Sequence, residues 1–264
     1  MHVVVCVKQV PDTTQLLAGQ VCELFTDEGL ARVVNPNDFA ALECALKLKD
    51  EYDARITVLS MGPSEAVQAL KQCLSYGADH AVLFTDAGLA NSDSFASSYA
   101  LSTAIQRLSQ AEPVAIVLCG RQSTDGASGQ TGASIARHLG WQQITSAHAI
   151  TEISLTAGTI CAVRVLERGR EHMRTRLPVV MAMGKDAPEI RYASLPNLLR
   201  ALRYTPEIWT LADVELDQNF IGVHGSPTRV QQLIAAPQRR GGEIVLVEQV
   251  GLEAAVASGL RLIG

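Results

Sequence analysis

The chain has 264 residues, of which 47% are hydrophobic and 19% charged, and its formal net charge at pH 7 is −5. This length permits one large α/β domain or two small ones, with enough apolar material for a sizeable core. The negative net charge argues against electrostatic binding to nucleic acid or to an anionic membrane surface.

Cysteine usage and the chain's apolar runs indicate the compartment. Six cysteines are scattered with no CxxC pair and no regular spacing, so we expect neither a disulfide framework nor a metal site. The first residues lack the pattern of a signal peptide, and no apolar run approaches the ~18 residues that span a bilayer. We therefore expect a cytoplasmic protein with no membrane insertion.

Strand-like and helix-like segments alternate along most of the chain. Apolar, strand-like runs lie at 2–8, 54–62, 80–86, 113–120 and 177–185. Helix-like segments lie at 37–52, 64–78, 92–109 and 129–140, and a pair of β-strands is expected at 144–154 and 159–167. This alternation predicts an α/β fold with a doubly wound, mainly parallel, Rossmann-like sheet. It does not fix the strand order.

The pattern changes after Lys185. The segment that follows contains several prolines and a short amphipathic turn at 195–202, and the last residues, 243–264, hold one strand-like and one helix-like piece. Such a tail has little core of its own. It is either a loose extension or an arm that packs on a partner chain.

The loop LCGRQSTDGASGQTG, residues 118–132, follows the fourth strand and contains four glycines. Glycine lets a backbone approach a ligand closely, and in parallel sheets ligands bind at the carboxyl ends of strands. Gly129, Gln130 and Thr131 lie at a helix start, where free amides can bind a phosphate. Asp125 can accept hydrogen bonds from a ribose or from the loop, and Arg121 is the loop's cation. The alternative is a turn made only for close packing.

Other strand ends point to the same edge of the sheet. Asn35 to Asp38 stand at a helix entrance, where they either cap the helix or meet an adenine edge. Met61 can pack on a purine face or in the core. No GxGxxG follows the first strand, no Walker A loop is present, and no GxSxG or HExxH motif occurs. We expect no catalytic side chain.

Several stretches together resemble the small (beta) subunit of electron transfer flavoproteins. They are VCVKQVPDT (5–13), VVNPNDFAALECALKLKDEY (33–52), ITVLSMGP (56–63), LCGRQSTDGASGQTG (118–132) and RYASLPNLLRA (191–201). The resemblance covers about residues 1–230. It implies the adenine-nucleotide α/β hydrolase-like fold, with a nucleotide-binding domain over 1–190 and a C-terminal arm over 191–264. The arm would carry a partner-docking loop and pack on the large (alpha) subunit.

The resemblance also implies which residues contact the nucleotide. These are Cys6, Asn35, Pro36, Asn37, Asp38, Met61, Gly120, Arg121, Gln122, Ser123, Thr124, Asp125, Gly126, Ala127, Ser128, Gly129, Gln130 and Thr131. Docking of a flavin dehydrogenase, such as an acyl-CoA dehydrogenase, is implied for Arg191, Tyr192, Leu195, Pro196, Asn197 and Leu198. Leu195 matches the exposed leucine that inserts into the dehydrogenase. Packing of Leu195 against its own helix is the alternative.

Two segments resemble electron-bifurcating members, which hold a second FAD in this subunit, where housekeeping members hold AMP. They are the serine-rich segment around Ser94 and Ser97, and the stretch 216–230. We therefore expect FAD here, with AMP as the alternative. The sequence departs from the family pattern at two places, which affect the pocket chemistry and the identity of the partner. Ala127-Ser128 replaces the usual Asp-Thr, and the junction at 188–192 is altered.

The resemblance implies half of a heterodimer that carries electrons rather than a stand-alone enzyme. NADH oxidation by the complex is implied only in the bifurcating case. The competing hypothesis is a free-standing adenine-nucleotide-binding module of the universal-stress type, which shares a similar sheet but has no use for the arm.

Overall fold

The structure is a computed structural model that describes residues 1–12, 30–185, 187–229, 231 and 246–260. The chain forms two compact units, Met1–Val230 and Gln231–Gly264. The described part of the second unit comprises the helices α6 (Val247–Val250) and α7 (Leu252–Leu260). The strand-like piece expected from residue 243 lies partly outside the described residues, and its described part is the helix α6.

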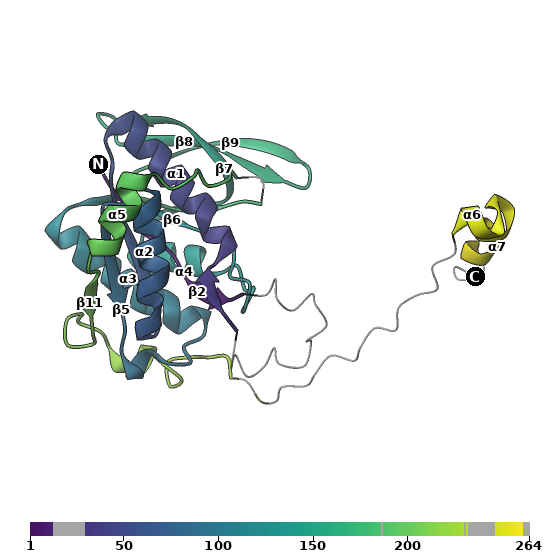
Figure 1. The fold of residues 1–264 in the computed structure, drawn as a ribbon. Coiled ribbons are helices and arrows are strands. Elements are labelled where there is room, and N and C mark those ends of the chain that lie inside the picture. Colours follow the sequence, from purple (N-terminus) through teal and green to yellow (C-terminus); the bar gives the residue numbers. More distant parts are fainter. Residues whose placement is uncertain (13–29, 186, 230, 232–245, 261–264) are drawn as a thin grey trace. The chain divides into compact units, whose positions relative to one another are not determined.

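A nine-stranded sheet forms the centre of the first unit, in the order β11-β5-β4-β1-β6-β10-β7-β8-β9 (Figure 1). The strands are β1 (His2–Cys6), β4 (Arg55–Met61), β5 (His80–Phe84), β6 (Val114–Cys119), β7 (Gln142–Ser154), β8 (Thr159–Leu166), β9 (Gly169–Arg176), β10 (Val179–Met183) and β11 (Glu207–Trp209). Pairing is parallel from β11 to β7 and antiparallel from β7 to β9. The predicted doubly wound, mainly parallel sheet is confirmed.

Three described β features were not predicted: the edge strands β9 and β11 of the large sheet, and a separate two-stranded sheet. β9 reads GREHMRTR and is largely exposed, so it lacks the apolar signal on which strand prediction depends. β2 (Gln9–Pro11) and β3 (Arg32–Val34) form a separate antiparallel pair. Three-residue strands such as these are too short to show a periodicity.

Helices cover both faces of the sheet. They are α1 (Pro36–Tyr52), α2 (Val67–Tyr76), α3 (Ser94–Ala111), α4 (Thr131–Leu139) and α5 (Leu195–Arg203). Short 3₁₀ turns are η2 (Ser64–Ala66), η3 (Ala87–Leu89) and η4 (Gln218–Phe220). The helix expected at 64–78 therefore starts with a 3₁₀ turn, and those expected at 92 and 129 begin two residues later.

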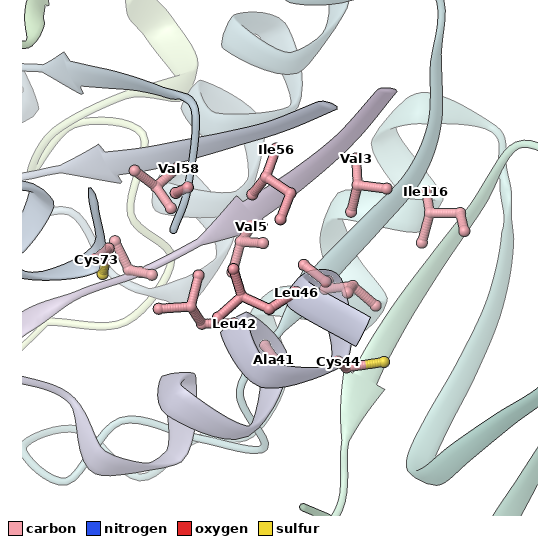
Figure 2. Close-up of a cluster of buried hydrophobic side chains, with 14 of the residues drawn as sticks. Val3, Val5, Ala41, Leu42, Cys44, Leu46, Ile56, Val58, Cys73 and Ile116 are labelled. Atoms are coloured by element: carbon pink, nitrogen blue, oxygen red, sulfur yellow. The ribbon is translucent and has the colours of Figure 1, made fainter. Parts of the chain in front are cut away.

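The alternation of side chains along β1 separates two apolar clusters. Val3 and Val5 pack with α1 and α2, whereas Val4 and Cys6 pack with α3 and α4. Figure 2 shows the first cluster, where Leu42 of α1 lies among valines of the sheet. Burial on both faces explains why β1 is apolar from Val3 to Cys6.

The segment after residue 190 contributes to the first unit. The buried Ala201 of α5 joins the first cluster, α5 packs on α2, and β11 extends the sheet beside β5. Arg200 Nη2 donates to the carbonyl oxygen of Ala78 at 2.7 Å. Residues of the expected arm as far as β11 are thus built into the α/β unit. Packing of the arm on a large subunit stays a prediction.

Among the described residues, no helix is both long and apolar enough to cross a membrane. The same residues contain no cluster of three or more His, Cys, Asp or Glu side chains arranged to hold a metal ion.

The buried Leu42 gives a test of the first cluster. We expect Leu42→Ala to lower the free energy of unfolding by about 2–5 kcal/mol, because the lost apolar contact leaves a cavity. Urea unfolding measures this change. Leu155→Ala is the control, since Leu155 is 54% exposed, and should change stability by less than about 0.5 kcal/mol. Equal effects of the two substitutions would contradict the burial of Leu42.

Candidate functional site

A cavity of about 480 Å³ opens at the carboxyl ends of β1, β4 and β6. Its walls also include the entrance of α1, the first turns of α3 and α4, and Thr228. These elements are far apart in sequence, and the parallel sheet brings their ends to one edge. The predicted convergence of strand ends therefore has a physical counterpart in the structure.

Most of the predicted nucleotide contacts line this cavity. They are Cys6, Asn35, Asp38, Met61, Ser94, Ser97, Gly120, Arg121, Gln122, Ser123, Gly126, Ser128, Gly129, Gln130 and Thr131. Pro36, Asn37, Thr124, Asp125 and Ala127 do not. The residues that sequence reasoning missed are Val7, Lys8, Ser92, Asp93, Leu101, Cys119, Gly132 and Thr228. Several of these adjoin predicted positions, so adjacency along a strand end was a usable signal.

The carboxylate of Asp38 helps to link three segments of the cavity rim, namely the end of β1, the start of α1 and the glycine loop at 118–132. Its Oδ2 accepts from the backbone N–H of Lys8 at 2.7 Å, and its Oδ1 accepts from Asn35 Nδ2 at 2.8 Å. Asn35 Nδ2 also donates to the carbonyl oxygen of Gln122 at 3.0 Å, and Asn37 Nδ2 does so at 2.8 Å. The end of β1, the start of α1 and the glycine loop are thus joined through side chains of α1 and its cap.

Gly120 is required by this contact. A Cβ atom at residue 120 would lie 2.2 Å from Asp38 Oδ1 and 2.7 Å from the carbonyl oxygen of Asn37. Both distances are far below van der Waals contact. The loop can therefore approach α1 only where it has no side chain.

The ion pair of Lys8 and Asp125 closes the outer side of the loop. Lys8 Nζ lies 2.5 Å from Asp125 Oδ2, and the backbone N–H of Gly126 donates to Asp125 Oδ1 at 2.6 Å. Burial alone would raise the pKa of Asp125, but the hydrogen bonds from Lys8, Ser123 and Gly126 outweigh burial and hold it below its ordinary value. In the structure Asp125 therefore shapes the loop, which was one of its two expected roles.

The start of α3 forms the opposite wall. Asp93 caps the helix by accepting from the backbone N–H groups of Phe95 and Ala96, and its other oxygen accepts from the backbone N–H of Thr228 at 2.9 Å. Burial would raise the pKa of Asp93, but these hydrogen bonds more than offset it and lower that pKa. They bring Thr228 beside Ser94 and Ser97, so hydroxyl groups gather on this wall.

Two groups in the cavity wall still offer hydrogen bonds. Asn35 is 1% exposed, and its Oδ1 has no hydrogen-bond partner among the described residues. A buried acceptor of this kind favours a ligand donor. At α4, the N-cap Gln130 makes no side-chain capping bond, so the first amides of the helix are available to an anion. The cavity is therefore lined by the first turn of α4 and by Asn35, whose buried Oδ1 is an unused acceptor among the described residues.

A smaller cavity of about 240 Å³ adjoins the first. It lies beside the middle of β7 and the ends of β8 and β10, and Arg121 lines both cavities. Ser146, which also lines it, has a backbone φ of 56°. Arg121 is thus the loop residue shared by the two hollows.

Of the predicted docking residues, Leu195, Pro196 and Leu198 are exposed apolar residues of α5, Asn197 of the same helix is half-buried, and Arg191 and Tyr192 precede the helix. Leu195 is 68% exposed and Tyr192 is fully exposed, and Leu198 is also exposed. In the segment just before α5, Arg191 makes a bidentate contact with the Glu43 carboxylate, which anchors that segment to α1. The Leu195 side chain is therefore not buried by packing against other described residues.

The buried carboxylate of Asp38 predicts a pH dependence of stability. Burial raises the pKa of Asp38 to about 7, although hydrogen bonds from Lys8 and Asn35 act in the opposite direction. The unfolded chain loses this proton near pH ~4. Between about pH 4 and 7 the folded state binds the extra proton, so the contribution of Asp38 to the free energy of unfolding falls as pH rises, by at most about 1.4 kcal/mol per unit.

Urea unfolding of Asp38→Asn across this range should show a flatter dependence on pH than the wild type. Asp53→Asn is the matched control, because Asp53 is exposed with a φ of 51° that asparagine also adopts. The control should keep the wild-type slope. Identical slopes for the wild type and Asp38→Asn would contradict the assignment.

Comparisons with known proteins identify the family. Residues 23–213 match the family model described as "Electron transfer flavoprotein domain". Protein FixA of Azotobacter vinelandii is 37% identical over 249 residues, which cover 94% of this chain and 88% of FixA.

Two further relatives are named "Electron transfer flavoprotein subunit beta". The protein of Megasphaera elsdenii is 38% identical over 260 residues, covering 97% of this chain and 95% of its own length. The protein of Clostridium acetobutylicum is 36% identical over 245 residues, covering 93% and 92%. The match spans nearly the whole of each chain and includes the strand-end cavity. The chain belongs to the electron transfer flavoprotein family, as the resemblance of its strand-end motifs to beta subunits implied.

Proposed function

We propose that the chain is the beta subunit of a heterodimeric electron transfer flavoprotein and that its strand-end cavity binds an adenine nucleotide. In this role it passes electrons between a flavin dehydrogenase and a downstream acceptor, and no side chain breaks a bond. The observation that supports it best is that one cavity is lined both by the first turn of α4, whose N-cap side chain makes no capping bond, and by Asn35, whose buried Oδ1 has no partner among the described residues.

The residues present fit the two ends of an adenylate. The N-terminal amides of α4 at Thr131 and Gly132 suit a phosphate, since their partial positive charge is not used by a cap. Asn35 Oδ1 suits an amino group such as that of adenine, because an acceptor buried without a donor is costly. Met61 and Leu101 supply apolar surface for a ring.

The wall of α3 favours FAD over AMP. An adenylate held between Asn35 and α4 leaves the hydroxyl-lined side at Ser94, Ser97 and Thr228 for a further group. A bound flavin would supply the electron-carrying chemistry. In this proposal the chain holds the cofactor and places hydroxyl groups beside it, and the complex oxidises NADH and divides the electrons between two acceptors. AMP is the alternative occupant.

The second part of the proposal concerns partners. Residues 191–264 would pack on an alpha subunit, and the exposed face of α5 would dock a flavin dehydrogenase such as an acyl-CoA dehydrogenase. One apolar anchor on a polar rim is usual in transient interfaces. Membership of the family favours this over a free-standing module of the universal-stress type.

Nucleotide content tests the cavity. We expect denaturation of the purified heterodimer to release two FAD and no AMP, measured by chromatography, whereas one of each would assign AMP to this subunit.

Gly120→Ala should displace the rim from Asp38 at a cost of about 1–3 kcal/mol, so the affinity of the beta cavity should fall roughly 10- to 100-fold.

Gly62→Ala is the matched control on the neighbouring strand end. A Cβ atom there would meet Ala66 Cβ at an ordinary 3.5 Å, and Gly62 does not line the cavity. This variant should retain its nucleotide. If Gly120→Ala retains as much nucleotide as Gly62→Ala, the cavity is not the binding site.

Leu195→Ala tests the docking face. We expect electron exchange with the partner dehydrogenase to slow by roughly tenfold or more, because an exposed anchor is removed. Flavin content should stay unchanged. Leu155→Ala is the control: it removes an exposed leucine that lies outside the docking face and should leave the rate of electron exchange unaltered. Loss of flavin from Leu195→Ala would instead assign Leu195 to the fold.

A further inference from the structure

Two cysteines meet at the strand ends that bound the cavity. Cys6 is the last residue of β1 and Cys119 the last residue of β6, and the two are register partners in this parallel pair. Both belong to the apolar cluster shared with α3 and α4, so their side chains lie on one face of the sheet. Both also line the cavity.

The two thiols are close enough to react with each other. The neighbouring side chain of Cys6, together with burial, raises the pKa of Cys119, and the two residues are direct register partners. Neighbouring strands lie about 4.8 Å apart, which falls within the Cα separation of ~4.4–6.8 Å of disulfides. The pair therefore meets the distance condition without a change of fold.

The surroundings favour a bond between the thiols over addition of a larger group. Cys6 is 8% exposed and Cys119 is 5% exposed. The first turn of α4 lies against Cys119, since a Cβ atom at Gly132 would come within 3.7 Å of its Sγ. A disulfide adds no atoms at this crowded position, whereas an adduct would have to enter the cavity.

We propose that Cys6 and Cys119 form a redox-active dithiol, which a hydroperoxide oxidises to a disulfide inside the nucleotide cavity. One thiolate attacks the peroxide, so that an S–O bond forms, the O–O bond breaks, and the leaving oxygen takes up a proton. The second thiol attacks the sulfenic sulfur, so that the S–S bond forms, the S–O bond breaks, and water leaves. Two thiols and one hydrogen peroxide thus give one disulfide and two waters, and a dithiol reductant reverses the change.

The position of the pair links this chemistry to the cavity. Lys8 follows Cys6 by two residues and Gly120 follows Cys119 directly, and both contact Asp38. A bond between the strand ends would therefore act on the rim, and a ligand in the cavity would cover the thiols. This second consequence rests on the proposed nucleotide binding. Because only the thiolate reacts, the raised pKa predicts slow oxidation that speeds up with rising pH.

The test is a peptide map of the full chain, purified in its complex and treated with hydrogen peroxide after bound nucleotide has been removed. Digestion without reductant at acidic pH should yield the Cys6 peptide joined to the Cys119 peptide, with the loss of two hydrogen atoms, and dithiothreitol should separate them. Cys6→Ser and Cys119→Ser should each abolish the link. Cys44→Ser should keep it, because Cys44 lies in the other apolar cluster (Figure 2).

Several outcomes would overturn the dithiol: both thiols remaining free, each oxidised singly with no link, or a link from either one to Cys22 or Cys161. Should a serine variant fail to fold, the wild-type map decides alone. Once bound nucleotide has been removed, added AMP should slow the link. A link that AMP does not slow supports the dithiol and counts against nucleotide binding in the cavity. Absence of any link from nucleotide-free complex that still binds AMP overturns the dithiol alone.

Discussion

The candidate site depends on one buried carboxylate. Asp38 accepts from the backbone of Lys8 and from Asn35, and Gly120 approaches it with no side chain between. These contacts fix the end of β1, the start of α1 and the glycine loop relative to one another. Because an unpaired buried carboxylate is costly, the partners of Asp38 cannot move independently. The shape of the cavity follows from this constraint.

Two aspartates on the same rim differ in charge because their surroundings differ. Asp38 is buried away from water, and burial dominates its pKa. Asp125 lies further out with the ammonium group of Lys8, and hydrogen bonds dominate its pKa. The rim thus combines an inner carboxyl group whose charge changes near neutral pH with an outer one that stays ionised.

Much of the fold and part of the site could be predicted from the sequence. Continuous apolar strands alternating with helices require a parallel sheet, and its strand ends must converge, which located Met61 and the glycine loop. Sequence could not separate residues that line the cavity from Asn37 and Asp125, which support the loop, because both kinds carry polar side chains in the segments that meet at this edge of the sheet. Thr228 was missed as a wall residue because only the folded chain brings it to Asp93. β9 was missed because its side chains are polar.

The anchoring of α5 has a kinetic consequence. Arg200 binds the carbonyl oxygen of Ala78, and Arg191 binds Glu43. The leucines of α5 are therefore presented by a backbone that is already ordered. Any molecule that lands on this face gives up its own freedom of motion but imposes little loss of conformational entropy on the helix. We expect such an encounter to require no folding step, so it can form and dissociate rapidly and still be selective.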